Sequence, residues 1–248
     1  MRQRPFVLPS DPHAPFPPAG SAMRDPDGLL AIGGDLSLPR LLNAYRHGIF
    51  PWFSSGQPPL WWSPDPRMVF HTDDVRLSSR FRRQLKQSHW EVRADTCFDQ
   101  VIAACAQSPR PGQHGTWITS GMRQAYIDLH RQGHAHSVEV FEGNALVGGI
   151  YGVAIGRMFF GESMFSARSG GSKIALAALA ARLHAWGWPL IDAQVENDHL
   201  HSMGGRLMPR AAFLEQVASL VDTPSSEETW TDRFGVMPAA SLSQPTVP

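Results

Sequence analysis

The chain has 248 residues, of which 42% are hydrophobic and 18% are charged, so it holds enough apolar material for a packed core and is neither a disordered chain nor a coiled coil. Its 22 basic and 22 acidic residues cancel, so no overall charge indicates a nucleic acid or a membrane as the partner. The first ten residues lack the apolar core of a signal peptide, and two cysteines are too few for a disulfide framework. We therefore expect a cytoplasmic protein with one large domain or two small ones.

The first 66 residues contain 13 of the 21 prolines, so we expect a small, loop-rich N-terminal domain there. One helix is predicted within it, capped by Ser37 and ended by Gly48. After this helix, aromatic residues stand beside prolines in the stretches 49–53 and 60–62.

From residue 67 the pattern becomes regular and predicts a catalytic domain that ends at residue 221. In chain order we expect a strand at 68–71, helices at 77–87, 97–107 and 120–132, strands at 137–142, 146–155 and 158–165, a helix at 173–186, a strand at 189–195 and a helix at 210–221. Residues 222–248 lack periodicity and are predicted to form a flexible tail. A meander of strands, a glycine turn, a helix and a further strand favour an α/β (α+β) fold with a mixed, acyltransferase-like sheet.

Polar side chains interrupt two of these apolar strands. By alternation Glu162 shares a face with Phe160 and Met164, where a carboxylate costs several kcal/mol unless it is paired. It is therefore either a functional acid or an outward-facing residue of an edge strand. Asp192 and Gln194 project from one face of the next strand and form either the floor of a polar site or a buried hydrogen-bonded pair.

One short stretch is strongly basic. It contains, with no acidic residue among them, Arg76, Arg80, Arg82, Arg83 and Lys86. The spacing of three of its arginines predicts one basic helix face, which is either a phosphate-binding surface or a solvated face. Later in the chain, the turn 168–173 is either a phosphate-binding loop or an ordinary helix cap.

No other pattern predicts a metal site or a nucleophile. The histidines lack an H-E-x-x-H frame, and there is no G-x-S-x-G motif. Neither cysteine has an evident activating setting, and the leucine stripe in the helix at 173–186 is typical of a core face.

Several longer stretches, read together, resemble the leucyl/phenylalanyl-tRNA–protein transferase family. They run in family order over about residues 27–215 and include GIFPWF (48–53), LWWSPDPR (60–67), GTWIT (115–119), FFGESMFS (159–166) and LIDAQVENDHL (190–200). The resemblance implies a bacterial cytoplasmic enzyme that moves Leu or Phe, with Met as a further donor, from aminoacyl-tRNA to the α-amine of an N-terminal Arg or Lys. The product is a degradation signal. It also implies a monomer, a small N-terminal domain, an acetyltransferase-like (GNAT-like) catalytic domain, and no metal or organic cofactor.

The resemblance also assigns roles to residues of this chain. It implies that Asp192 and Gln194 are catalytic and that Glu162 lies in the site, with Asp192 orienting Gln194 toward the incoming amine. Trp52 and Trp117 fall at positions that contact the aminoacyl-adenosine end, and Tyr126 falls near the site. The implied amino-acid pocket consists of Ile150, Met164, Leu176, Leu179, Leu183 and Ile191.

Two departures from the family accompany these assignments. Leu179 and Leu183 replace phenylalanines of the best-known member, which changes the expected shape of the pocket, and residues 109–114 are extra. The basic stretch is expected to contact tRNA phosphates. The alternatives are an acyl-CoA N-acyltransferase, which would bind acetyl-CoA, and a non-catalytic RNA-binding protein, which would bind uncharged tRNA equally well.

Overall fold

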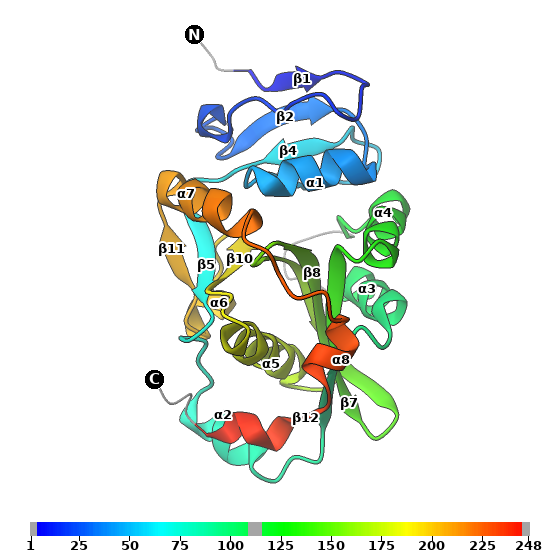
Figure 1. Ribbon diagram of the computed structural model, residues 1–248, viewed down its shortest axis with the longest axis vertical. Helices are drawn as coiled ribbons and strands as arrows, with labels where there is room; N and C mark the ends of the chain where they lie inside the picture. Colours follow the sequence, from blue (N-terminus) through cyan, green and yellow to red (C-terminus); the bar gives the residue numbers. More distant parts are fainter. Residues whose placement is uncertain (1–3, 109–115, 245–248) are drawn as a thin grey trace.

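In the computed structural model, which describes residues 4–108 and 116–244, a small sheet lies at one end of an elongated molecule and a larger sheet fills the rest (Figure 1). The small sheet has the strand order β1-β2-β4-β3. Its elements are β1 (Phe6–Leu8), a 3-10 turn η1 (Ala19–Ser21), β2 (Leu29–Gly33), α1 (Leu38–Arg46), β3 (Phe50–Pro51) and β4 (Leu60–Trp62).

Helix α1 begins and ends where the sequence predicts. Ser37 occupies the N-cap position, but its side chain makes no capping hydrogen bond, so that part of the prediction is wrong. Gly48 ends the helix with φ of +69°, and a Cβ atom there would stand 2.5 Å from the side chain of Leu214. Only glycine therefore lets the chain turn this closely beside a later helix, α7 (Arg210–Val221).

The large sheet has eight strands in the order β11-β5-β10-β9-β8-β7-β6-β12. Its elements are β5 (Arg67–His71), α2 (Ser79–Leu85), β6 (Glu91–Ala94), α3 (Phe98–Gln107), α4 (Ser120–Arg131), β7 (Ala135–Glu142), β8 (Ala145–Ile155), β9 (Met158–Ser166), α5 (Gly171–Ala185), β10 (Leu190–Gln194), α6 (Asp198–Ser202), β11 (Arg206–Met208) and α7 (Arg210–Val221). Only β9 and β10 are parallel, and the other neighbours are antiparallel. The mixed α/β class expected from the sequence is confirmed.

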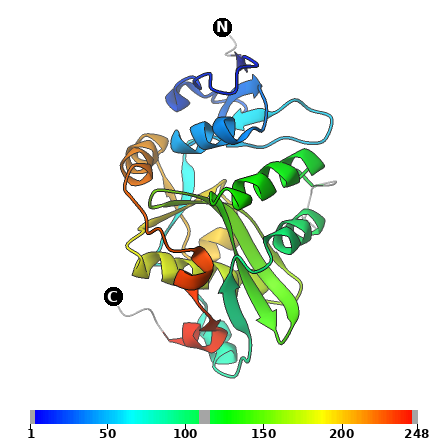
Figure 2. The ribbon, with the colours of Figure 1, turned by 45° about the vertical axis from the view of Figure 1, so that its right-hand side comes forward.

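Helices cover both faces of the large sheet. Tyr151 and Val153 of β8 belong to the core beneath α3 and α4, whereas Ile150 and Ala154 belong to the core beneath α5. Figure 2 shows α3 and α4 on one side of these strands and α5 on the other. The first of these cores continues into the small sheet through residues such as Trp61, so the two sheets share apolar packing.

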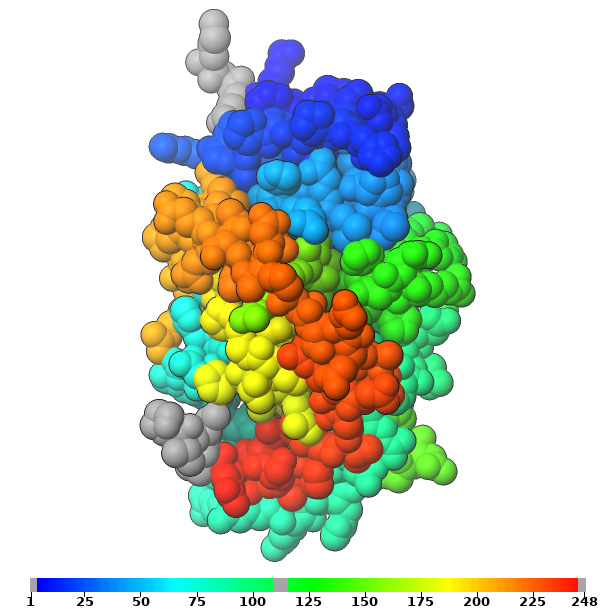
Figure 3. All heavy atoms as spheres, in the orientation of Figure 1, coloured from blue at the N-terminus to red at the C-terminus, as the bar shows by residue number. Residues whose placement is uncertain are grey.

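The C-terminal segment differs from the predicted flexible tail. It forms α8 (Trp230–Phe234), β12 (Met237–Pro238), which pairs with β6, and a 3-10 turn η2 (Ala239–Ser243). Within this segment Trp230, Phe234 and Ala239 are buried in the core. In the space-filling view the residues after α7 run as an orange-to-red band over this face (Figure 3). The prediction is wrong because irregularly spaced apolar residues anchor the segment without any helical or strand period; residues 245–248 lie outside the described residues.

Short elements account for the other differences. The helix predicted at 77–87 is shorter, because Ser78 caps it by accepting a hydrogen bond from the backbone N–H of Phe81. Sequence patterns did not predict β6, β11 or α6, which have only three to five residues each. Among the residues that the structure describes, no helix is long and apolar enough to cross a membrane.

Candidate functional site

The carboxylate of Glu162 lies at the centre of the site and accepts three hydrogen bonds. The hydroxyl of Tyr45 on α1 donates to Oε1 over 2.7 Å, and the hydroxyl of Tyr126 on α4 donates to Oε2 over 2.9 Å. Nε2 of Gln194, at the end of β10, donates to Oε1 over 2.7 Å. Glu162 is only 8% exposed, so these donors replace the water that a free carboxylate would bind.

A β-bulge aims Glu162 at its donors. Tyr151 of β8 pairs with Ser163 and Gly152 pairs with Gly161, which leaves Glu162 without a partner across the sheet. The alternation expected from the sequence is therefore broken at this residue. Phe160 joins the core on the α3 side and Met164 packs on the α5 side, so the prediction that both share a face with Glu162 is wrong.

Glu162 and its two tyrosine partners hold their protons more tightly than the same side chains do in water. Burial raises the pKa of Glu162 to about 7, against the lowering effect of its three hydrogen bonds. Burial, reinforced by the nearby carboxylate, raises the pKa of Tyr45 and Tyr126 well above the usual range, so both hydroxyls keep their protons.

The two tyrosines and Glu162 form one hydrogen-bonded cluster. The hydroxyl of Tyr45 hydrogen-bonds to that of Tyr126 as well as to Glu162. With its pKa of about 7, Glu162 can gain or lose a proton near neutral pH, whereas both hydroxyls keep theirs.

Asp192 lies beneath Gln194 and is completely buried. Its two oxygens accept a bidentate pair of hydrogen bonds from Arg67, at 2.8 Å from Nε and 2.7 Å from Nη2. The same Oδ1 accepts the backbone N–H of Gln194 over 2.9 Å, and Gln194 has a φ of +62°. Asp192 therefore holds Gln194 in an unusual left-handed conformation.

Arg67 is itself held between two aromatic rings. Its guanidinium carbon lies 4.7 Å from the centre of the Phe50 ring and 4.6 Å from that of Phe213. Phe50 belongs to the small sheet and Phe213 to α7. The resemblance assigned no role to Arg67; its place at the start of a strand, within the string LWWSPDPR, was the only sequence signal available.

Two cavities meet at Glu162 and Gln194. The first, of about 360 Å³, is bordered by Trp52 and Trp117 on one side and by the segment 193–197 on the other. The second, of about 160 Å³, is mainly apolar, and its lining includes four predicted pocket residues, Ile150, Met164, Leu176 and Ile191. Phe70 and Leu200 also line it, although the sequence analysis did not single them out.

The structure does not bring two predicted pocket residues to this cavity. Leu179 and Leu183 are completely buried and are absent from its lining, because they lie one and two turns beyond Leu176 along α5. Tyr126 is also buried, and it acts on the site through Glu162.

Trp52 and Trp117 also border a third cavity, of about 970 Å³, which extends along β4 and the start of α4. Trp62 fixes Trp52 by donating an indole hydrogen bond of 2.7 Å to its backbone carbonyl. The structure thus places both predicted tryptophans at the junction of two cavities. The extra segment 109–114 lies outside the described residues.

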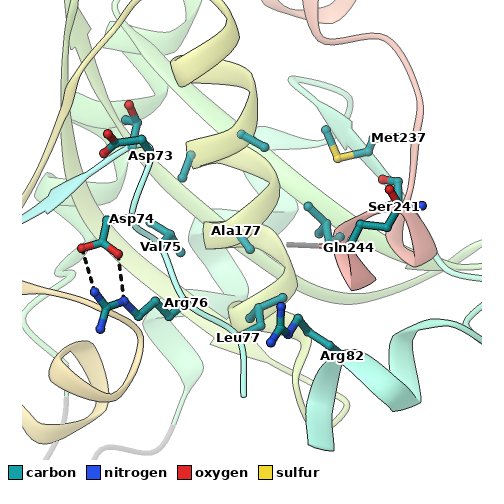
Figure 4. Close-up of a pocket in the computed structure, with 14 residues that line it drawn as sticks. Asp73, Asp74, Val75, Arg76, Leu77, Arg82, Ala177, Met237, Ser241 and Gln244 are labelled. Atoms are coloured by element: carbon teal, nitrogen blue, oxygen red, sulfur yellow. Dashed lines mark hydrogen bonds and ion pairs between the residues drawn. The ribbon is translucent and has the colours of Figure 1, made fainter. Parts of the chain in front are cut away.

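The basic stretch lies at the opposite end of the molecule from the small sheet (Figure 1). Arg76 precedes α2 and forms an ion pair with Asp74, with its Nε 2.8 Å from Oδ1, so the expectation of a single unpaired helix face is wrong there. Figure 4 shows Arg76 and Arg82 beside a cavity between the segment 72–77, α5 and the C-terminal segment. No ion pair to another described residue is formed by Arg80, Arg82, Arg83 or Lys86.

The remaining sequence candidates are structural. Gly170, with φ of +91°, caps α5, and the backbone N–H of Ser172 donates to Ser166 over 2.8 Å, as in an ordinary helix cap. Within residues 4–108 and 116–244, no three His, Cys, Asp or Glu side chains are placed to hold a metal ion.

Comparisons with known proteins agree on one family. The model of a family described as leucyl/phenylalanyl-tRNA protein transferase matches residues 69–218, and that of the family's N-terminal domain matches residues 34–65. A leucyl/phenylalanyl-tRNA–protein transferase from Xanthomonas axonopodis pv. citri is 70% identical over 243 residues, which cover 98% of each chain. One from Xylella fastidiosa is 62% identical over 95% of this chain and 97% of its own. A GCN5-related N-acetyltransferase-like structure from Streptococcus suis has a TM-score of 0.33 at 10% identity, and the match covers 65% of this chain and 59% of that one.

Proposed function

The chain belongs to the leucyl/phenylalanyl-tRNA–protein transferase family, and we propose that it transfers leucine or phenylalanine from aminoacyl-tRNA to the N-terminal α-amine of a protein that begins with Arg or Lys. One observation in particular supports this activity. Glu162, with its pKa of about 7, and its donor Gln194 lie where a mainly apolar cavity of amino-acid size meets a wider cavity bordered by tryptophans. We also propose that the protein is cytoplasmic and that it consists of two domains, residues 1–66 and residues 67–221.

The apolar cavity suits the side chain that is transferred. A pocket of this kind distinguishes one methylene by only ~1–3 kcal/mol, so a mixed preference for Leu, Phe and Met is physically expected. Trp52 and Trp117 would stack against the terminal adenosine of the tRNA, because aromatic rings bind bases in single-stranded ends.

The basic helix α2 would contact phosphates of the acceptor stem through the arginines that lack an ion pair to another described residue. Lys173 lies 5.9 Å from the ring of Phe81 on α2, so the start of α5 links this surface to Leu176 in the amino-acid pocket. If α2 binds phosphates, the Michaelis constant for aminoacyl-tRNA should rise steeply with salt. A constant that is insensitive to salt would contradict this part of the proposal.

The aminoacyl ester is already activated, so the enzyme needs positioning and proton handling rather than ATP. The amine nitrogen attacks the ester carbonyl, the bond to the ribose oxygen breaks, the amine loses a proton and the ribose oxygen gains one. An N-terminal amine titrates near ~7.7–8.0, so part of it is neutral in the cell. Oε1 of Gln194 makes no hydrogen bond to another described residue and would accept an N–H of this amine.

Glu162 would take the proton that the amine releases, because its pKa of about 7 suits a general base and it borders both cavities. Asp192 and Arg67 would act as positioning residues that fix the backbone of Gln194. A glutamine side chain is too weak a base to take this proton. Gln194 therefore aligns the amine, and Glu162 accepts the proton.

Transfer of radiolabelled Leu and Phe from their tRNAs to peptides that begin with Arg or Ala tests the proposal. We expect label on the Arg peptide alone, with a loss of transfer in Glu162→Gln and in Gln194→Ala. Absence of label with tRNA still bound would refute an enzyme activity and favour an RNA-binding protein. Saturable binding of acetyl-CoA would favour an acyl-CoA transferase.

A further inference from the structure

The cavity beside Gln194 carries negative charge. Of its described lining residues only Glu162 and Glu196 are charged. Glu162 is enclosed by its three donors, whereas the side chain of Glu196 is 54% exposed on the segment that follows β10. The charge that an arriving acceptor meets first is therefore that of Glu196.

A hydrogen bond fixes the position of Glu196. Its Oε1 lies 2.6 Å from Nε2 of His201, whose Nδ1 lies 3.3 Å from the carbonyl oxygen of Gly205. Its Oε2 makes no hydrogen bond within the described part of the chain, so one carboxylate oxygen is left for a ligand.

An exposed apolar surface lies next to this carboxylate. Val195 is 40% exposed, which few large apolar side chains in the described residues match, and it borders the same cavity as Trp52 and Trp117. A side chain with an apolar stem and a cationic head can place its methylenes on such a surface while its head reaches a carboxylate. Arg and Lys are the side chains with that construction.

The spacing along the chain also fits such a ligand. Only Val195 separates Gln194 from Glu196. The chain turns at Gln194, where the backbone N–H of Val195 donates to the carbonyl oxygen of Ala193 over 2.8 Å. Gln194, Val195 and Glu196 therefore all border the same cavity. An α-amine held by Gln194 thus leaves the acceptor's own side chain to run along Val195 toward Glu196, as the long stem and terminal charge of lysine or arginine allow.

We propose that Glu196, with Val195 beside it, forms the subsite that selects a cationic first residue of the acceptor protein. This assignment rests on the proposed function, because it specifies the acceptor at the same site. Glu196 determines specificity and takes no part in the proton transfer.

The test compares peptides that begin with Arg and with citrulline, which keeps the shape of Arg but lacks its charge. For wild-type protein we expect a clear preference in kcat/KM for the Arg peptide. Glu196→Gln should reduce the Arg-to-citrulline ratio by about fivefold and leave the KM for aminoacyl-tRNA unchanged. Glu196→Asp should restore most of the ratio.

Asp198→Asn provides the matched control, since it removes the same charge two residues further along and Asp198 does not line the cavity. It should leave the ratio at its wild-type value. An unchanged ratio in Glu196→Gln, with normal transfer to the Arg peptide, overturns the assignment while the proposed function stands. Absence of transfer by the wild-type protein to any peptide overturns the proposed function and this assignment with it.

Discussion

Replacement of Arg67 by methionine tests how the site is held together. Arg67 and Asp192 are both completely buried and joined by two hydrogen bonds of 2.8 and 2.7 Å. Methionine fills most of the space between the rings of Phe50 and Phe213, so Arg67→Met removes the charge and leaves Asp192 as an unpaired buried carboxylate. Breaking one partner out of a buried pair costs ~3–5 kcal/mol, a large part of the ~5–15 kcal/mol that stabilises a typical domain.

For a chain of this size each kcal/mol lowers the melting temperature by about 2–4 °C, so we expect Arg67→Met to melt about 6–20 °C below wild type. The double variant Arg67→Met/Asp192→Asn removes the unpaired charge and keeps an oxygen that can accept the N–H of Gln194. It should recover at least half of the loss, measured by circular dichroism during heating. A melting temperature of Arg67→Met within about 3 °C of wild type, or a double variant no more stable than the single one, would refute the reasoning.

Three further predictions concern the acid groups and the apolar pocket. Tyr45→Phe removes a hydrogen bond that lowers the pKa of Glu162, so the rise of kcat/KM with pH should move to higher pH; a move to lower pH would contradict the role of Glu162 as base. The folded-state pKa of Glu139 is raised to about 7, mainly by burial, so the folded protein holds that proton more tightly than the unfolded chain and loses stability as the pH rises from about 4.5 to 7. Urea unfolding at pH 5 and at pH 8 measures this loss of stability. Between these two pH values Glu139→Gln should lose less stability than wild type, by on the order of 3 kcal/mol, and an equal loss in both proteins would exclude Glu139 as its source. Leu176→Ala widens the pocket and should shift transfer toward Phe over Leu by up to about tenfold, whereas Leu183→Ala, outside the cavity lining, should leave that ratio unchanged.

The sequence predicted the long elements of the large sheet because their apolar periods run over many residues and glycines mark their ends. It did not predict β6, β11 or α6, which are too short to show a period. It also missed the order of the C-terminal segment, where a few large side chains such as Trp230 anchor a stretch rich in polar residues. Local pattern thus predicts elements that stabilise themselves by regular burial, and it misses those held by single contacts.

The candidate site shows the same division. Glu162, Asp192 and Gln194 could be selected because a polar residue on an apolar strand needs a partner, and the structure supplies one to each. The partners themselves could not be selected. Tyr45 is 117 residues from Glu162, and Arg67 is 125 residues from Asp192, so no spacing connects them in the sequence. The bulge at Glu162 could not be predicted either, because it depends on the register between β9 and β8.

These distant partners connect the small sheet to the candidate site. Tyr45 and Phe50 come from the N-terminal part of the chain, yet they act on Glu162 and Arg67 of the large sheet. Separation of the two sheets would remove the Tyr45 donor from Glu162, open its buried carboxyl to water and expose one side of the Arg67 guanidinium. The proton affinity of Glu162 and the support of Gln194 through Arg67 and Asp192 therefore depend on packing between the two sheets, so under the proposed mechanism the first 66 residues bear on proton transfer as well as on the border of the cavity.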